Sequence, residues 1–206
     1  IGAYVLVSNR LDQNNEGEEV FFQNAQEIFD RFPEVDFGIY ECPMPWKRLV
    51  SLDFLRKVAP EGRMVFLKDT CCDYELIRER LKAVEGTPLK IFNANAQSWY
   101  DSYCHGSAGY NGVMANFHPD LYKWCFDHKD TDYDKARLVA DFLTTAAMIE
   151  MRAYPVSAKY HQNLVDVPMS LVTRSADAAK LDKNARGEVE SLIAMENYVR
   201  KQLGIL

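Results

Sequence analysis

Short apolar segments alternate with helical patterns over about the first 130 residues, and this alternation restricts the possible folds more than any other feature. The strand candidates are residues 3–7, 37–40, 63–68, 89–93 and 109–115. The segments that follow them predict helices over residues 19–32, 51–58, 74–84, 97–104 and 119–126. Strand followed by helix, repeated in this way, requires parallel strands with right-handed crossovers. An open doubly wound sheet and a closed (β/α)₈ barrel both accept this pattern.

The last third of the chain has no strand candidates. Helical periodicity predicts a long helix over 132–152, a short one over 155–164 and a last one over 188–203. We therefore expect two parts, an α/β body over residues 1–130 and a helical extension over residues 131–206 that packs on it. No Gly-x-Gly-x-x-Gly follows a strand, which weighs against a dinucleotide-binding open sheet.

Charge and composition exclude several classes of partner. The chain has 24 Lys and Arg against 30 Asp and Glu, a net charge of −6, and its basic residues are spread out. We therefore expect neither nucleic acid nor a membrane as its main partner. The longest uncharged run, residues 102–119, contains glycines, asparagines and two histidines, so it cannot form a spanning helix.

The cysteines predict a reducing compartment. There are five, an odd number, and none has zinc-finger or Cys-x-x-Cys spacing. Adjacent Cys71 and Cys72 are poorly placed to form one disulfide or to bind one metal ion. We expect reduced thiols packed as small apolar groups, no metal site, and a cytoplasmic protein.

Chemistry in parallel βα folds lies at the carboxyl ends of the strands, where Tyr40 and Lys68 are predicted to lie. Partial burial of the Lys68 amine would lower its pKa, and a neutral amine attacks a carbonyl to form a Schiff base. Tyr40 on the neighbouring strand would then transfer a proton. The alternative is structural: Lys68 pairs with Asp69 or Asp73 at the rim, and Tyr40 covers the core.

Four sequence motifs resemble those of the dihydrodipicolinate synthase/N-acetylneuraminate lyase family of class I aldolases. In chain order they are Tyr-Glu-Cys-Pro at 40–43, Leu-Lys-Asp-Thr at 67–70, Gly-Tyr-Asn-Gly-Val-Met at 109–114 and Tyr-Pro-Val-Ser-Ala-Lys at 154–159. Arg174 stands where an Arg often follows the fourth motif. The resemblance extends from about residue 2 to the end, and four motifs in order make it fairly specific.

This resemblance implies a (β/α)₈ TIM barrel with a three-helix C-terminal extension. Lys68 would form the Schiff base with pyruvate or another 2-keto acid, with Tyr40 as acid/base and no other cofactor. Aldol cleavage or condensation would then follow through an enamine, with an aldehyde-type compound as the second substrate. Val113 and Met114 on the last strand would lie beside the keto acid, and Asn93 at a strand end is a further substrate-binding candidate. The family is commonly oligomeric, so we expect a homo-oligomer, a tetramer or a dimer.

The chain also departs from the family pattern. Cys71 and Cys72 replace a small residue, and an Arg that many members place after the tyrosine motif has no direct counterpart. Arg48 or Lys47 would have to bind the substrate carboxylate by a different path. His118 follows the last strand, either as a site residue or, as we favour, as a capping or half-buried group.

The five strand candidates correspond to strands four to eight of the family's barrel, and no segment corresponds to the first three βα units. We therefore expect these residues to form part of an enzyme and to be inactive alone. A second hypothesis is a family-like barrel that has lost catalysis and acts as a small-molecule binding or regulatory protein. A third is an unrelated open α/β binding domain.

Overall fold

The computed structural model describes residues 2–205. Contacts between residues divide the chain into two compact units, Ile1–Asn111 and Gly112–Leu206. The first unit is α/β and the second is helical. The expected body of residues 1–130 and extension of residues 131–206 stay a prediction.

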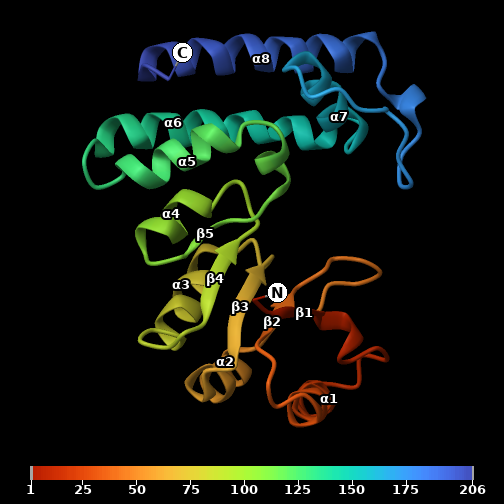
Figure 1. Ribbon diagram of the computed structural model, residues 1–206, viewed down its shortest axis with the longest axis vertical. Coiled ribbons are helices and arrows are strands. Elements are labelled where there is room, and N and C mark those ends of the chain that lie inside the picture. Colours follow the sequence, from red (N-terminus) through yellow and green to blue (C-terminus); the bar gives the residue numbers. More distant parts are fainter. Residues whose placement is uncertain (1, 206) are drawn as a thin grey trace. The chain divides into compact units, whose positions relative to one another are not determined.

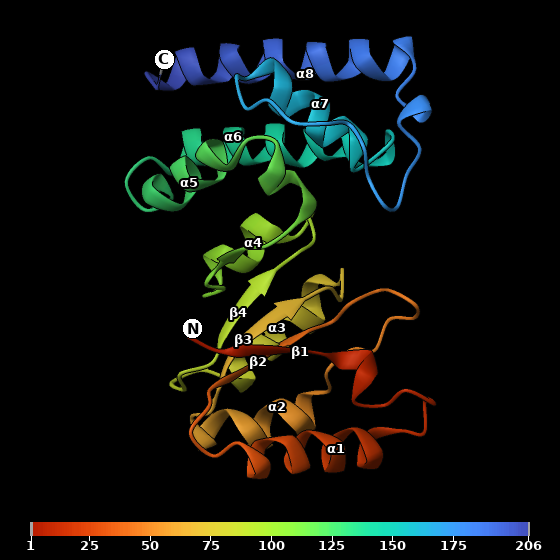
Figure 2. The ribbon, with the colours of Figure 1, turned by 45° about the vertical axis from the view of Figure 1, so that its right-hand side comes forward.

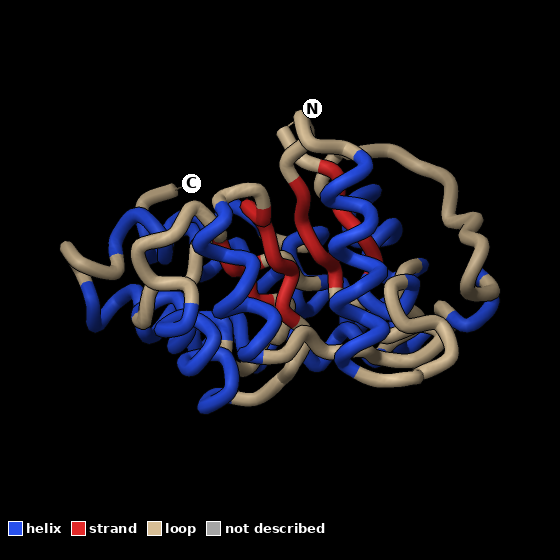
Figure 3. Tube along the Cα trace, turned by 90° about the horizontal axis from the view of Figure 1, so that it is seen from below, coloured by secondary structure: helices blue, strands red, loops and turns tan. Residues whose placement is uncertain are grey.

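A parallel sheet of five strands forms the first unit (Figure 1), which confirms the predicted α/β class. The strands lie in chain order, each paired with the next: β1 (Tyr4–Val7), β2 (Phe37–Tyr40), β3 (Met64–Asp69), β4 (Lys90–Asn93) and β5 (Gly109–Tyr110). The helices that link them, drawn in blue in Figure 3, are α1 (Glu18–Arg31), α2 (Leu52–Val58), α3 (Tyr74–Ala83) and α4 (Trp99–Cys104). Short 3₁₀ segments lie at Ser8–Arg10 (η1) and Ala59–Glu61 (η2).

Side-chain caps fix where two of these helices begin. Ser51 Oγ accepts a hydrogen bond from the Phe54 amide at 3.0 Å, which starts α2. Asp73 Oδ1 accepts from the amides of Glu75 and Leu76 at 2.9 Å, which starts α3. Each cap satisfies amides that have no partner inside the helix. Both caps lie where the sequence predicts that these helices begin.

The core of this unit lies between one face of the sheet and helices α1 to α3. Alternate strand residues such as Ile39, Leu67 and Ile91 point to this face and are fully or almost fully buried. Helices α1 and α2 lie beside each other (Figure 2), joined by an edge-to-face contact of Phe21 and Phe54 with ring centroids 5.0 Å apart. The apolar face of the sheet is thereby sealed.

The opposite face of the sheet carries the other half of the alternation. Tyr40, Phe66 and Lys68 point to this face and are half-buried. Phe66 packs against Phe92 of β4 with ring centroids 5.2 Å apart, and its side chain crosses the backbone of Gly38. Phe66 and Phe92 therefore cover the middle of this face, and Lys68 and Tyr40 lie nearer the carboxyl ends of the strands.

Helices make up the second unit. They are η3 (Val113–Asn116), α5 (Pro119–His128), α6 (Tyr133–Ala146), η4 (Ala147–Met151), α7 (Val156–Leu164), η5 (Ala178–Lys180) and α8 (Lys183–Leu203). Helices α5 and α6 lie side by side, as do α7 and α8 (Figures 1 and 2). Within residues 2–205, no helix combines the length and the apolar character that crossing a bilayer requires.

Three predicted boundaries are wrong. The helix expected over 132–152 ends as α6 at Ala146, where the 3₁₀ segment η4 begins. The fifth strand ends at Tyr110 rather than at residue 115, because η3 replaces it. A hydrogen bond from the Ala115 amide to the Gly112 carbonyl at 3.3 Å closes this 3₁₀ turn. Helix α8 begins at Lys183 rather than at residue 188, because Asp182 Oδ1 accepts from the Ala185 amide at 2.8 Å and caps it earlier.

Gly38→Ala tests the close approach of β2 and β3. A Cβ at Gly38 would lie 2.8 Å from Cδ1 of Phe66, closer than real contacts allow. We expect the substitution to lower the free energy of unfolding by about 1–3 kcal/mol, measured by urea titration. Gly187→Ala is the control, because no atom lies within 4 Å of the added Cβ in α8; there we expect a gain of about 0.5–1 kcal/mol. Equal stabilities of Gly38→Ala and the unaltered protein would contradict this prediction.

Candidate active site

Lys68 and Tyr40 lie directly opposite each other in the pairing of β2 and β3. Residues in register on neighbouring strands point to the same face, so the two side chains are adjacent. The Lys68 Nζ atom lies 4.3 Å from the centroid of the Tyr40 ring. The structure thus brings together the two residues that the sequence assigns to catalysis.

The surroundings of Lys68 favour a neutral amine. Burial lowers the pKa of Lys68, and an electrostatic interaction with the nearby Cys42 side chain opposes this shift in part. In the part of the chain that the structure describes, no carboxylate lies within ion-pairing distance of its Nζ. Asp69 instead binds Arg80, and Asp73 caps α3. The structural alternative, in which Lys68 pairs with either aspartate, is therefore not what the structure contains.

The other predicted substrate-binding residues of this unit already have partners. Arg48 binds Asp12 at 3.1 Å and Glu18 at 2.8 Å. Asn93, which is almost fully buried, donates from Nδ2 to two serine hydroxyls in and just before α4, both at 3.0 Å. Asn93 thus anchors the loop after β4. Substrate binding by Arg48 and Asn93 stays a prediction. To bind a substrate, Arg48 would have to give up its ion pair with Asp12 or Glu18.

Val113 and Met114 lie in the second unit, in η3. They were predicted on a strand and lie in a 3₁₀ helix instead, where Met114 is fully buried and Val113 is half-buried. A hydrogen bond from Asn116 Nδ2 to the Val113 carbonyl at 2.9 Å helps to hold this turn. The proposed contact of these residues with a keto acid stays a prediction.

The loop after Tyr40 is fixed by hydrogen bonds from Asn9, a residue that was not among the predicted site residues. Asn9, just after β1, is buried and points its Nδ2 at the carbonyls of Cys42, Met44 and Trp46, at 3.2, 2.9 and 2.7 Å. A single amide group thereby fixes three points of this loop. Its position next to Ser8, at a predicted strand end, was the available signal.

All five cysteines are free thiols. Burial raises the pKa of Cys71 to about 12, with a smaller contribution from Asp69. Burial also raises the pKa of Cys125 to about 12. These two thiols are therefore protonated and poorly nucleophilic. Among residues 2–205, no three His, Cys, Asp or Glu side chains cluster in the manner of a metal site.

The second unit has a buried polar cluster of its own, centred on Glu196 of α8. His118 Nδ1 lies 2.7 Å from Glu196 Oε1, and His161 Nε2 lies 3.0 Å from the same atom. Arg200 contacts the other carboxylate oxygen at 3.2 Å and forms a bidentate pair with Asp120. His118 is the N-cap residue of α5, as expected, but its side chain makes no capping hydrogen bond and is fully buried rather than half-buried. Its ring joins the start of α5 to α8.

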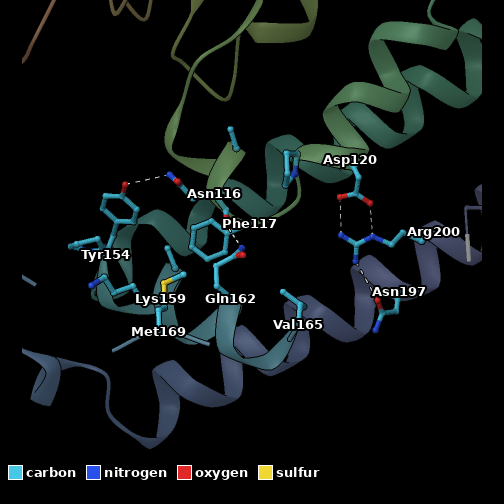
Figure 4. A pocket seen from close by; sticks show the side chains of 14 residues that line it. Asn116, Phe117, Asp120, Tyr154, Lys159, Gln162, Val165, Met169, Asn197 and Arg200 are labelled. Atoms are coloured by element: carbon cyan, nitrogen blue, oxygen red, sulfur yellow. Dashed lines mark hydrogen bonds and ion pairs between the residues drawn. The ribbon is translucent and has the colours of Figure 1, made fainter. Parts of the chain in front are cut away.

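A cavity of about 750 Å³ also lies within this unit (Figure 4). Its polar lining consists mainly of the amides of Asn116, Gln162 and Asn197, together with Lys159 and Arg200. Both of these cationic groups already have partners. Lys159 donates a hydrogen bond to the Val172 carbonyl, and Arg200 binds the carboxylates described above. No predicted site residue lines this cavity.

Glu196→Gln tests the buried carboxylate through pH. Burial alone would raise the pKa of Glu196, but His118 and His161 outweigh it and lower this pKa to about 2, against an ordinary value of 4.5. The folded state therefore binds this proton less tightly than the unfolded chain does. The resulting stability is present above pH 4.5 and is lost as pH falls toward 2.

We expect the free energy of unfolding to fall between pH 5 and pH 3 by about 2 kcal/mol more in the unaltered protein than in Glu196→Gln, measured by urea titration. Glu150→Gln is the control, because burial raises the pKa of Glu150 and its proton stabilises the folded state. That variant should lose at least as much stability in acid as the unaltered protein. An unchanged pH dependence in Glu196→Gln would contradict the prediction.

Comparison with known proteins gives matches in structure but not in sequence. No protein-family profile and no curated protein sequence matches the chain. A monomeric dihydrodipicolinate synthase variant superposes with a TM-score of 0.77 at 17% identity, over 98% of this chain and 65% of its own. A prophage protein of the dihydrodipicolinic acid synthase family from E. coli K12, in complex with pyruvate, gives a TM-score of 0.78 at 16% identity, over 94% of this chain and 66% of its own.

Dihydrodipicolinate synthase from Thermotoga maritima gives a TM-score of 0.74 at 16% identity, over all of this chain and 67% of its own. The chain thus spans about two thirds of the length of these structures. The resemblance predicted from four sequence motifs is confirmed by the path of the backbone. This chain has the fold of dihydrodipicolinate synthase family structures over about two thirds of their length.

Proposed function

We propose that this chain forms part of a Schiff-base lyase or aldolase that acts on pyruvate or another 2-keto acid. The observation that carries the proposal is the pair of Lys68 and Tyr40, in register on parallel strands, with the amine 4.3 Å from the ring centroid. The lowered pKa of Lys68 supports it, since only the neutral amine is a nucleophile. The likeness to a family member solved with pyruvate points to the same substrate class.

In this proposal the five strands occupy positions four to eight of a (β/α)₈ barrel. The strands run parallel in chain order, and the helices of the first unit pack on one face of the sheet, as such a barrel requires. Lys68 and Tyr40 point to the opposite face, which is the interior of a closed barrel. The remaining βα units, a homo-oligomeric assembly and a cytoplasmic location belong to the proposal as well.

The proposed reaction begins with attack of the neutral Lys68 amine on the keto carbon. A C–N bond forms, the carbonyl oxygen takes up protons and leaves as water, and an iminium ion results. Loss of a proton from the neighbouring carbon gives an enamine, which forms a C–C bond with an aldehyde. Tyr40 is the group beside the amine that transfers these protons. Hydrolysis of the product iminium releases Lys68 again.

Borohydride trapping tests the Schiff base directly. With pyruvate and borohydride, we expect the full protein to gain a stable adduct on Lys68, located by peptide mass spectrometry. Lys68→Met should lose the adduct entirely, because no other amine occupies this position. Lys90→Met is the matched control, since Lys90 is an exposed lysine of β4 in the same sheet. Absence of an adduct with every small 2-keto acid tried would overturn the proposal.

Tyr40→Phe tests the proton transfer. We expect kcat to fall about 10²–10⁴-fold, because general acid-base catalysis contributes this much. KM for the keto acid should change little, since the ring that lies beside the Lys68 amine is retained. Steady-state kinetics separates the two quantities. Parallel loss of kcat and of keto-acid binding would show that Tyr40 has a structural role instead.

A second candidate, a family-like barrel that binds a small molecule without catalysis, is favoured by one observation. Both cationic side chains of the loop after Tyr40 are already bound: Arg48 to two carboxylates, and Lys47 to the Thr70 carbonyl at 2.7 Å. A carboxylate substrate would need another binding group or a change in these contacts. Pyruvate binding without a trapped adduct would favour this candidate.

A further inference from the structure

A buried ionic cluster lies behind the two proposed catalytic residues. Arg80 of α3 binds Glu41 through Nη2 at 2.8 Å, and its Nη1 contacts both Glu41 and Asp69. All three side chains are completely excluded from solvent. One guanidinium thus bridges two carboxylates inside the protein.

The position of this cluster follows from strand geometry. Glu41 directly follows Tyr40, and Asp69 directly follows Lys68. Since successive strand residues point to opposite faces, the carboxylates lie on the helix side of the sheet when the phenol and the amine lie on the other. Arg80 therefore grips β2 and β3 at the residues next to the proposed catalytic pair.

Glu41 itself ties the ends of the two strands together. Its Oε2 accepts from the Thr70 amide at 2.7 Å, and its carbonyl accepts from the Thr70 hydroxyl at 2.8 Å. Its amide donates to the Lys68 carbonyl at 3.3 Å, and its Oε1 accepts from the Val50 amide at 2.7 Å. The bonds to Thr70 and Lys68 join residues within two positions of Tyr40 and Lys68. The bond to Val50 fixes the loop between β2 and α2. Any shift of Glu41 would therefore move the catalytic pair.

Stability alone does not account for such a cluster. Burial raises the pKa of Glu41, Arg80 opposes this shift, and Asp69 adds to it, so the cluster carries opposed electrostatic effects. Buried ion pairs often contribute no more to stability than apolar side chains of the same volume. The bridging geometry is specific, however, because only a planar guanidinium presents a rigid fork to two carboxylates.

We infer that Arg80 is a positioning residue: through Glu41 and Asp69, it holds the ends of β2 and β3 so that Lys68 and Tyr40 stay adjacent. The inference rests on the proposed function, because it assigns Arg80 a part in that chemistry. Small displacements of reacting groups cost up to about 10²-fold in rate. Arg80 contributes through geometry and does not itself contact the substrate.

Arg80→Lys keeps the charge but removes the fork. Arg63→Lys is the matched control, since Arg63 lies at the other end of β3, and its guanidinium donates to the carbonyls of Phe29, Phe32 and Val35 at 2.7, 2.5 and 3.0 Å. We expect both variants to lose stability, measured by urea titration. Only Arg80→Lys should also lower kcat with pyruvate, by about 10–100-fold with KM little changed.

A second readout does not depend on keto-acid chemistry. Acetylation of Lys68 by acetic anhydride, followed by mass spectrometry over a range of pH, reports the pKa and the exposure of its amine. We expect this profile to shift in Arg80→Lys and to stay unchanged in Arg63→Lys. An unaltered Lys68 profile in Arg80→Lys, or equal rate losses in the two variants, would overturn the inference.

The two proposals fail in different ways. If the unaltered protein forms no adduct with any 2-keto acid, the proposed function fails, and the acetylation profile still decides whether Arg80 positions Lys68. If Arg80→Lys does not fold, Glu41→Gln replaces it, because it keeps the shape of the side chain while weakening the bridge to Arg80. A normal Lys68 profile and a normal kcat in folded Glu41→Gln would then overturn the inference.

Discussion

Alternation of side chains along a strand separates two kinds of chemistry at the ends of β2 and β3. Tyr40 and Lys68 point to one face, where the amine is half-buried and has a lowered pKa. Their neighbours Glu41 and Asp69 point to the other, where Arg80 satisfies both. A single residue of register slip would exchange the two sets and bury an unpaired amine in the apolar core. Correct pairing of these two strands is therefore the condition on which the proposed site depends.

Much of the fold could be predicted from the sequence, because its local signals agree with one another. Apolar runs of strand length that alternate with helical patterns favoured parallel βα units, and the structure has them. The prediction was wrong where apolar pattern and local hydrogen bonding compete. Residues 109–115 resemble a strand, but the bond from the Ala115 amide to the Gly112 carbonyl and the side chain of Asn116 stabilise a 3₁₀ turn after Tyr110.

The site was predictable only in part. Lys68 and Tyr40 were identified because strand ends in parallel folds are known sites of chemistry, whereas the partners of Arg48 could not be read from spacing: Asp12 and Glu18 lie far from it in the chain. Arg80 escaped notice because a charged residue in a helix is usually exposed. Its signal was its position, three residues after Ile77 and beside Leu81, on the apolar stripe of α3.

The sheet is built in the order in which its strands are synthesised, since each strand pairs with the one before it in the chain. Within the described sheet, no pairing joins strands that are far apart in the sequence. Each new βα unit can dock on the edge left by the previous one, and the loops to be closed are short. These five strands can therefore assemble one after another while the chain is still emerging from the ribosome.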